Sequence, residues 1–437
     1  MNQVQSNMDY KFGRRNKGMK IVKGLALSAI ASSVVMAGGY KIPEQSINSM
    51  ALGAAYVAHT MGADTAYYNP ANMAFMADKQ YVEGAITLAH LPSNSYTLGG
   101  PYSGQSKEEN LLIPSFHYVS NAMGDFRWGI STVVPGGLTK RWETPLQKAT
   151  AEEFTLKIIE INPSVSYKVS DNFSIGGGLR IVYSEGVVKS DSTDAFNMGL
   201  AGAGVSRDME GDTIEFGYNL ALAYKPTSDI NIAMTYRSNV DLNEEGDATL
   251  KFNGITMYKG DASVEVPLPA ALNLAISKTW DNKFTLEFNY ERTFWSEYKT
   301  LDFEYGGANI GPLTPVFDTP IARNWSDTNT FRLGATMKMD NKFTVMMGFA
   351  IDETPVPPQY IGFELPDTDA KIASIGFRYQ QSENLSWGAA FLYDSKDPLA
   401  LKKGAHHNQS PTNLLNQGGS FGGGGAYLTT VGMAYEF

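Results

Sequence analysis

Alternation of apolar and polar residues with a period of two constrains the fold of this chain more than any other feature. The stretch KFTLEFNYE, residues 283–291, has large apolar side chains at even positions and polar side chains at odd positions. Successive side chains of a β-strand point to opposite faces, so this stretch predicts a strand with one apolar face. The same alternation returns at Ile230–Tyr236 and Leu385–Tyr393. Such strands belong either to a soluble sandwich or to a barrel whose outer face contacts lipid.

The order of short and long connections distinguishes these two architectures. Fourteen strand candidates lie near 80–90, 111–120, 126–138, 153–169, 172–189, 212–225, 229–251, 258–280, 283–304, 326–339, 342–351, 370–381, 384–394 and 426–437. Six short turns alternate with seven long polar or glycine-rich loops near 91–110, 139–152, 190–211, 241–257, 305–325, 352–369 and 395–425. Bacterial outer-membrane barrels sort their connections in this way and have an even number of strands, whereas a sandwich has no reason to do so. We therefore predict an all-β transmembrane barrel of about 14 antiparallel strands over residues 79–437, in the bacterial outer membrane.

The first residues have the features of an export signal. Basic residues between Arg14 and Lys23 precede a short apolar run, Gly24–Met36, and Val35-Met36-Ala37 fits a small-residue cleavage site. A run of thirteen residues is too short to cross a hydrocarbon core of about 30 Å as a helix. We expect residues 1–37 to be a signal peptide, with Met1 and Met19 as alternative start sites.

The end of the chain and its composition indicate the partners. The last predicted strand ends on the aromatic Phe437, which looks like the signal read by outer-membrane assembly machinery, so that machinery and the membrane lipid are expected partners. The chain contains no Cys, which excludes a disulfide framework. Its formal net charge of −10 argues against nucleic acid as a partner. We expect a monomer.

The stretch TAYYNPANMAF, residues 65–75, precedes the first predicted strand and contains a helix-start signal. Asn is a favoured helix cap and Pro is favoured in the first helical position, so Asn69 and Pro70 predict a short helical turn. The preceding residues 51–66 are rich in Ala and Gly and show no strand alternation. The segment is either a periplasmic tail or a plug inside the barrel. A tail would expose Tyr67 and Tyr68 to water, so we predict that residues 38–78 form a plug.

The chain resembles the FadL/TodX-type outer-membrane transporters of long-chain fatty acids and other hydrophobic compounds. The resemblance covers essentially the whole mature chain. It is carried, in this order, by residues 38–75 with Asn69-Pro70-Ala71, by MTYRSNV (234–240), by FNYERTFWSEYKTL (288–301) and by FAIDETPVPPQYIGFELPDTD (349–369). It implies a fourteen-stranded barrel with an N-terminal hatch in the lumen, in which Asn69, Pro70 and Ala71 form the plug motif.

The third predicted strand contains VVPGGLT, residues 133–139. Pro135 has no N–H for the strand ladder, and Gly136 and Gly137 weaken strand pairing. The resemblance implies an inward kink and a lateral opening at this place. We therefore predict a lateral gate at Pro135, Gly136 and Gly137, and the alternative is an ordinary strand end that leads into an outer loop.

A ligand with a long apolar chain and one carboxylate needs an apolar cavity and a cation. Cations on lumen-facing positions of the predicted strands are Arg180, Arg237, Arg332, Lys338 and Arg378. Taken singly, each of them is expected to pair with a wall carboxylate such as Glu287 or Glu291. Arg237 lies in the MTYRSNV motif, so it is the leading candidate for the head group, followed by Arg332, Arg180 and Arg378.

Enzymatic and metal-binding functions find little support in the sequence. The chain has five His and no Ser/His/Asp arrangement at a recognisable spacing. His406-His407 lacks further ligands at a set spacing, and the glycine-rich 418–425 lacks the Gly-Lys of a phosphate loop. We predict no catalysis, no cofactor and no metal.

The predicted function is uptake of long-chain fatty acids or other hydrophobic small molecules, through binding in the barrel and lateral release into the membrane. The apolar run in the outer loop at 196–205 is a candidate for a first collection site. A general hydrophilic porin and an outer-membrane lipid hydrolase are the alternatives.

Overall fold

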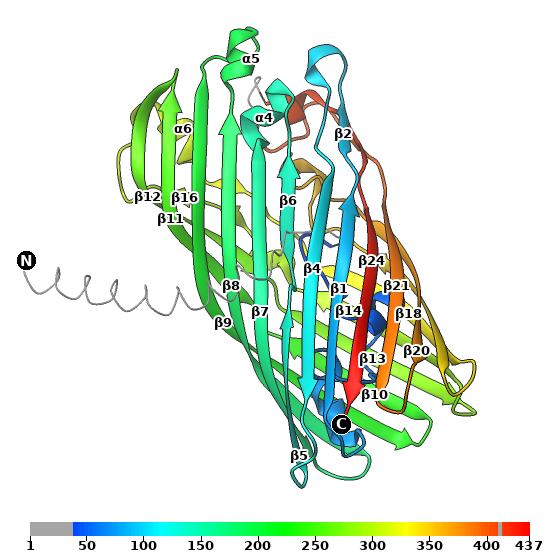
Figure 1. The fold of residues 1–437 in the computed structure, drawn as a ribbon. Coiled ribbons are helices and arrows are strands. Elements are labelled where there is room, and N and C mark those ends of the chain that lie inside the picture. Colours follow the sequence, from blue (N-terminus) through cyan, green and yellow to red (C-terminus); the bar gives the residue numbers. More distant parts are fainter. Residues whose placement is uncertain (1–37, 410–412) are drawn as a thin grey trace, which may run out of the picture.

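The computed structural model describes residues 38–409 and 413–437 of the chain. The predicted signal peptide, residues 1–37, lies outside the described residues. The described residues form a closed barrel of fourteen antiparallel strands around an N-terminal plug, which confirms the predicted fold class (Figure 1). No helix within these two ranges is long and apolar enough to cross a membrane.

Ten wall strands are single elements. These are β1 (Tyr81–Leu91), β4 (Glu109–Val119), β7 (Glu153–Lys168), β8 (Phe173–Asp191), β9 (Val205–Thr227), β18 (Thr328–Lys338), β19 (Phe343–Asp352), β20 (Ala370–Gln380), β21 (Leu385–Lys396) and β24 (Ala426–Glu436). Four wall strands are each split in two. They are β5 (Phe126–Val133) with β6 (Gly137–Arg141), β10 (Ile230–Arg237) with β11 (Val240–Phe252), β12 (Ile255–Leu268) with β13 (Ala271–Trp280), and β14 (Phe284–Thr293) with β16 (Phe303–Glu304).

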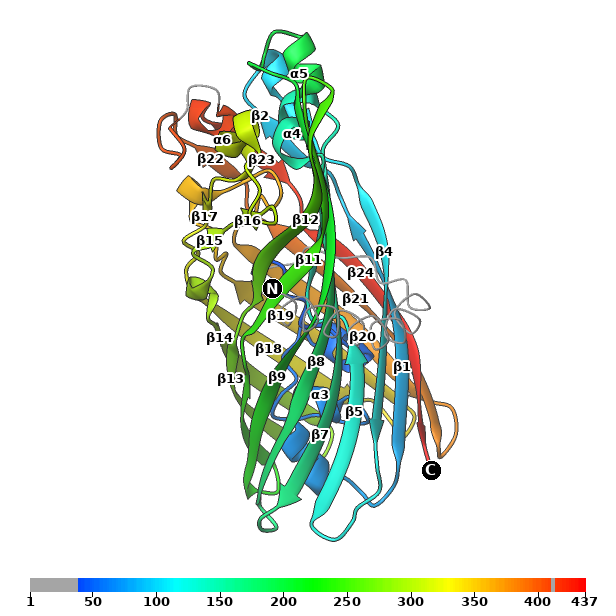
Figure 2. The same cartoon turned by 90° about the vertical axis from the view of Figure 1, so that its left-hand side faces the viewer.

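The first and last strands close the barrel. β1 pairs with β24 from Tyr81↔Glu436 to His90↔Tyr427, and on its other side it pairs with β4. Closure leaves no free sheet edge in the membrane, where an unpaired backbone group would cost several kcal/mol. The short turns lie at one end of the barrel and the long connections at the other (Figure 2). In outer-membrane barrels the end with short turns faces the periplasm.

The predicted alternation of faces is confirmed on the wall strands. On β14, Phe288 is 45% exposed on the outside, whereas Glu287 and Asn289 are buried on the lumen side. The outer face of β24 likewise exposes Val431 and Met433. The outside of the barrel is therefore apolar, as contact with hydrocarbon requires, and the polar residues point inward.

The outer end is covered by the long connections. They contain the helices α4 (Pro145–Ala151), α5 (Thr193–Asn197) and α6 (Thr314–Phe317), the short 3₁₀ turns η2 (Gly100–Tyr102), η3 (Trp295–Glu297), η4 (Gly311–Leu313), η5 (Pro358–Tyr360) and η6 (Leu414–Gln417), and the small strands β2 (Asn94–Thr97), β3 (Gly104–Gln105), β15 (Thr300–Leu301), β17 (Ile321–Ala322), β22 (Leu399–Leu401) and β23 (Gly419–Gly423). Their aromatic side chains, among them Trp142, Trp295 and Trp325, pack into one buried cluster. The loop predicted near 241–257 is wrong, because β11 and β12 run through it and turn at Asn253-Gly254.

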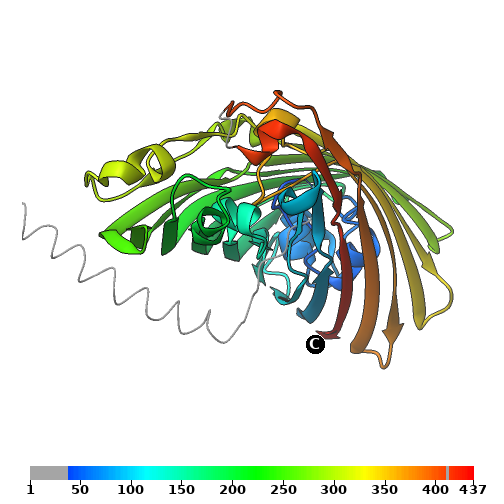
Figure 3. The same cartoon turned by 90° about the horizontal axis from the view of Figure 1, so that it is seen from above.

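The plug lies inside the barrel and is composed of α2 (Ile47–Ala51), α3 (Thr65–Tyr68) and η1 (Pro70–Phe75) (Figure 3). The helix-start signal is confirmed as a 3₁₀ turn, since the side chain of Asn69 accepts a hydrogen bond from Ala71 N at 3.1 Å and Pro70 begins the turn. Serines of the wall hold the plug backbone. Ser164 donates to Ala66 O at 3.1 Å, Ser174 to Ala71 O at 2.8 Å and Ser374 to Ala51 O at 2.9 Å.

Candidate ligand cavity and wall opening

The third wall strand leaves the barrel wall between Val133 and Gly137. Its ladder with β4 covers only Phe116–Val119, so within the described residues 110–115 of β4 have no strand partner on this side. The interval is bounded on the outer side by Arg141, whose Nε donates to Glu109 Oε1 at 2.8 Å. An interval of this kind is an opening in the hydrogen-bonded wall.

The displaced backbone finds its partners on the plug. Ile42 N donates to Pro135 O at 2.9 Å, and Gly137 N donates to Tyr40 O at 2.8 Å. A Cβ on Gly136 would lie 2.8 Å from Tyr40 O, so only glycine allows this approach. Residues 40–42, which we call the bridging segment, thus replace β4 as the partner of the broken strand.

Prolines reduce the cost of this break. Pro135 has no N–H on the displaced strand, and Pro114 has none on the opposite rim of the opening. Behind the opening, Leu111, Ile113 and Val134 pack with Ile42 in a buried apolar cluster. The opening is therefore filled by side chains in this structure, although its backbone groups are not paired across it.

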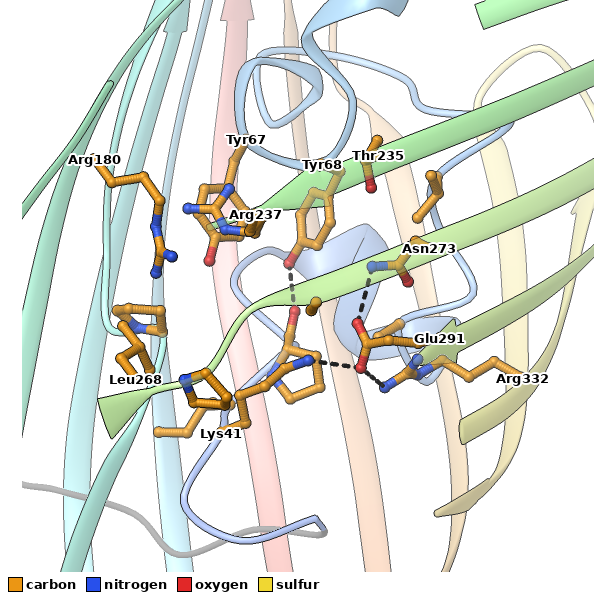
Figure 4. A pocket seen from close by; sticks show the side chains of 17 residues that line it. Lys41, Tyr67, Tyr68, Arg180, Thr235, Arg237, Leu268, Asn273, Glu291 and Arg332 are labelled. Atoms are coloured by element: carbon orange, nitrogen blue, oxygen red, sulfur yellow. Dashed lines mark hydrogen bonds and ion pairs between the residues drawn. The ribbon is translucent and has the colours of Figure 1, made fainter. Parts of the chain in front are cut away.

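A small cavity lies directly behind the bridging segment (Figure 4). Its volume is about 70 Å³, which is room for a few water molecules. Its polar lining consists of Lys41, Tyr67, Tyr68, Arg180, Thr235, Arg237, Asn273, Glu291 and Arg332, and its apolar lining of Ile42, Pro43, Ala54, Val57, Pro135, Leu268, Pro269 and Ala271. We call this space the upper cavity. It joins the plug, the strand break and the lumen wall at one place.

One side of the upper cavity carries two guanidinium groups on a single carboxylate. Arg180 of β8 donates to Glu160 Oε2 through Nε and a terminal nitrogen, each at 3.0 Å, and Arg237 of β10 is ion-paired with Glu160 Oε1. The guanidinium of Arg237 also stacks over the Tyr67 ring at 4.3 Å from its centre. This group of two cations and one carboxylate leaves one positive charge without a partner.

The other side carries a second group of charges. Glu291 Oε1 accepts hydrogen bonds from Lys41 Nζ at 2.6 Å and from Arg332 at 3.3 Å. Burial lowers the pKa of the Lys41 ammonium, and Glu291 offsets this effect. Asp352 lies close enough to interact with Arg332, so this side has a further carboxylate to balance its two cations. The uncompensated positive charge is therefore on the Arg237 side.

The structure brings together three of the four predicted head-group residues. Arg180, Arg237 and Arg332 line the upper cavity, whereas Arg378 lies on the periplasmic side of the plug, where it donates to Glu83 Oε1 at 2.7 Å. Arg378 therefore does not line the upper cavity with the other three candidates. Lys338 is exposed at the periplasmic end of β18.

The expected pairing of the candidate arginines with wall carboxylates is confirmed for all four, since Arg180 and Arg237 pair with Glu160, Arg332 with Glu291 and Arg378 with Glu83. Of the two carboxylates named in advance, Glu291 pairs with cations, whereas Glu287 accepts hydrogen bonds from plug backbone N–H groups. Sequence reasoning missed Glu160 and Lys41. The alternation on β7 places Glu160 on the lumen face and would have found it. No local signal marks Lys41, because its role follows from where the plug folds.

Comparison with known proteins identifies the family and several relatives of this chain. The profile of the family described as outer membrane protein transport protein (OMPP1/FadL/TodX) matches residues 28–437. The long-chain fatty acid transport protein of Escherichia coli K12 is 22% identical over 433 residues, which cover 87% of this chain and 93% of that protein. The 47 kDa outer membrane protein of Pasteurella multocida is 26% identical and covers 86% of this chain and 92% of its own length.

Solved structures share the fold. A FadL homologue of Pseudomonas aeruginosa superposes with a TM-score of 0.78 at 20% identity, over 91% of this chain and 99% of that chain. The toluene transporter TodX of Pseudomonas putida superposes with a TM-score of 0.67 at 15% identity, over 91% and 98% of the two chains. At these identities the superpositions establish the fold and leave the ligand to be argued from the site.

Proposed function

Because the chain belongs to the OMPP1/FadL/TodX family of outer membrane transport proteins, we propose that it takes up long-chain fatty acids or similar anionic hydrophobic molecules. The ligand binds in the upper cavity and leaves sideways through the opening at Pro135, Gly136 and Gly137 into the membrane. This proposal fits the fatty acid transport proteins among the relatives and departs from the toluene transporters, whose ligand has no charge.

The observation that carries the proposal is the uncompensated charge at Arg237. Among the described residues only Glu160 accepts a hydrogen bond from Arg237, and the side chain reaches the cavity with an exposure of 17%. A guanidinium with unused donors beside an apolar lining suits a carboxylate at the end of an alkyl chain. A neutral aromatic hydrocarbon would leave this charge without a partner, which is unfavourable in a buried site.

The sideways exit follows from the chemistry of the alkyl chain. Each buried CH₂ contributes about 0.8 kcal/mol, so a long chain is far more stable in lipid than in a watery channel. The upper cavity is too small for such a chain in this structure, so the chain displaces side chains that fill the opening, such as Ile42 and Val134. We also propose that the exposed Phe196 of α5 and Met198 at its end collect ligand outside the membrane.

The head-group assignment is tested by replacing Arg237 with Gln. We expect binding of a radiolabelled long-chain fatty acid to weaken by about tenfold, because one hydrogen bond to a charged group is lost. Binding of the fatty alcohol of the same length should change little. Lys338→Gln is the control, since it removes a cation at the exposed periplasmic end of β18, far from the cavity. Equal fatty acid affinity of the Arg237→Gln variant and the wild type would exclude this residue as the head-group site.

The exit is tested by replacing residues 135–137 with Val-Thr-Val. The new residues have ladder donors and strand propensity, and their side chains exclude the bridging segment, so we expect the third strand to straighten and pair with β4. Uptake of labelled oleate should fall to background while the amount of folded barrel in the membrane stays unchanged. Normal folding together with wild-type uptake would place the exit elsewhere.

The remaining functional assignments follow from the same reasoning. We propose that the protein performs no catalysis, acts as a monomer and is assembled by machinery that reads Phe437. A hydrophilic porin is disfavoured by the plug, whose backbone is hydrogen-bonded to the wall on several sides. Steady ion conductance of the wild-type protein in planar bilayers would favour the porin.

A further inference from the structure

A second cavity lies on the periplasmic side of the plug. Its volume is about 160 Å³, and it is lined by Met61, Gly62 and Ala63 of the plug and by polar wall groups, including Glu83, Arg378 and Gln380. We call it the lower cavity. The upper cavity is lined from the plug side by Ala54 and Val57. The stretch between these plug residues therefore runs from the lining of one cavity to the lining of the other.

This stretch, residues 54–62, is a loop between α2 and α3, and we call it the partition loop. It begins and ends in left-handed backbone conformations, with φ of 56° at Gly53, 61° at Ala54 and 90° at Gly62. Glycine adopts such angles without strain, so Gly53 and Gly62 suit the positions of hinges. The loop has no helix or strand of its own to hold it in place.

One wall carboxylate holds the partition loop. Glu287 of β14 accepts hydrogen bonds from three consecutive plug N–H groups: Oε1 from Val57 at 2.6 Å and Ala58 at 2.9 Å, and Oε2 from His59 at 2.7 Å. The Glu287 side chain is almost fully buried. Successive N–H groups that converge on one carboxylate form a concave anion site, here filled by the protein itself.

The other contacts of the loop are weaker or come from the plug. Asn69 donates to Val57 O at 2.9 Å, and Asn72 donates to the same carbonyl at 3.2 Å. Toward the wall, Val57 and Ala58 pack only in a small cluster with Ala233 and Ala275. Among the described contacts that join the loop to the wall, the carboxylate of Glu287 is thus the strongest.

We infer that Glu287 is a tether for the partition loop, and that release of the tether joins the two cavities into an axial passage from the ligand cavity to the periplasm. The lower cavity is lined by charged and amide groups, so the passage suits small, water-soluble molecules and ions rather than a long alkyl chain. It is distinct from the sideways exit proposed above, because it lies on the other side of the plug loop and uses no residue of the strand break.

The first experiment compares Glu287→Ala with wild type in planar bilayers. We expect Glu287→Ala to raise the fraction of time in a conducting state by about tenfold or more, because each hydrogen bond to a charged group shifts an equilibrium by about that factor. Thr285→Val on the same face of β14 is the matched control, since its hydroxyl contacts Thr279 and no plug residue. This control should stay as silent as the wild type.

Two further measurements separate a tether from general damage to the fold. Replacing chloride by acetate should reduce the conductance of Glu287→Ala, because acetate supplies the missing carboxylate to the three N–H groups. An oxidised disulfide between Ala58→Cys and Ala233→Cys in the same variant should close the passage, and reduction should reopen it. The wild-type chain has no Cys to interfere.

The inference is overturned if Glu287→Ala conducts no more than the wild type, or if its conductance persists with the disulfide formed. Fatty acid binding at Arg237 and the strand-break variant are measured separately. Failure of the axial passage therefore leaves those results as they stand.

Discussion

At the scale of the residue, glycines in the wall decide how closely the plug lies against the barrel. A Cβ on Gly176 of β8 would lie 2.6 Å from Ala71 N, and a Cβ on Gly348 of β19 would lie 2.1 Å from Leu52 C. Both atoms belong to the plug backbone, which has no freedom to yield as a long side chain does. At these two glycines the plug backbone, including Ala71, thus lies in direct contact with the wall.

Gly176→Ala should therefore destabilise the seated plug. Overpacking against backbone costs about 1–3 kcal/mol, so we expect a lower thermal unfolding temperature in detergent. Gly84→Ala on β1 is the control, because a Cβ there would meet its nearest neighbour at an ordinary 3.9 Å. Equal unfolding temperatures for both variants would show that the plug does not rest on β8.

A second residue-scale prediction concerns Asp64 of the plug. Burial, reinforced by Glu83, raises the pKa of Asp64 to about 8, against about 3.9 for an exposed aspartate. The folded state then holds the proton more tightly than the unfolded state. Stability from this group is full below about pH 4 and falls as the pH rises toward 8.

Asp64→Asn should flatten this dependence, as measured by the unfolding temperature in detergent between pH 5 and pH 8.5. Asn48 donates to Oδ2 of Asp64 at 3.1 Å and the Tyr56 hydroxyl donates to Oδ1 at 3.0 Å, and the single amide oxygen of Asn retains an acceptor for one of these two donors. The readout is therefore the slope of stability against pH and not its absolute value. An unchanged slope in the variant would assign the pH dependence to other groups.

At the scale of the element, the bridging segment connects the strand break to the outer loops. The ring of Tyr40 lies edge-on to Trp295, with ring centres 4.8 Å apart, and 5.8 Å from Trp325. The backbone of the same residue accepts the hydrogen bond from Gly137. The aromatic cluster of the loops and the opening in the wall are thus joined through one residue of the plug.

Tyr40→Ala should loosen the bridging segment and expose the opening. We expect a cysteine introduced by Val134→Cys, at a position buried in the present structure, to react several times faster with a lipid-soluble maleimide when Tyr40→Ala is also present. Tyr40→Phe keeps the ring contacts and loses only the hydroxyl bond to Pro267 O. The cysteine of Val134→Cys should therefore react slowly with the maleimide when it is combined with Tyr40→Phe. Equal rates in all three proteins would mean that the aromatic contacts do not hold the segment.

At the scale of the whole molecule, closure of the barrel accounts for its stability in lipid. Every wall strand has two neighbours, and the pairing of β1 with β24 completes the ring. Local opening of such a ring exposes backbone groups to hydrocarbon, so the barrel resists partial unfolding. The opening at the third strand is tolerated because the plug supplies the missing partners.

Unheated protein in dodecyl sulfate should therefore migrate differently on a gel from heated protein. Removal of residues 427–437 deletes the closing strand, and we expect this variant to lose the difference and to fail to accumulate in the outer membrane. A truncated chain that still shows the heat-dependent shift would contradict closure through β24.

The sequence alone determined the architecture. The architecture follows from three local patterns: the period-two alternation, the alternation of short turns with long loops, and the helix-start signal ahead of the first strand. Each pattern indicates a local conformation or its immediate environment. The lumen-facing positions of Arg180, Arg237 and Arg332 follow from the same alternation.

Only the tertiary structure decided which of these groups meet. The same alternation places Arg378 on the lumen face of its strand. Arg378 nevertheless lies on the periplasmic side of the plug, because the height of a residue in the barrel depends on strand tilt and register. The partners of Glu287 are backbone N–H groups, which are identical in every residue and leave no mark in the sequence. The break in the third strand is visible as Pro135-Gly136-Gly137, but its stability depends on the plug segment that folds against it.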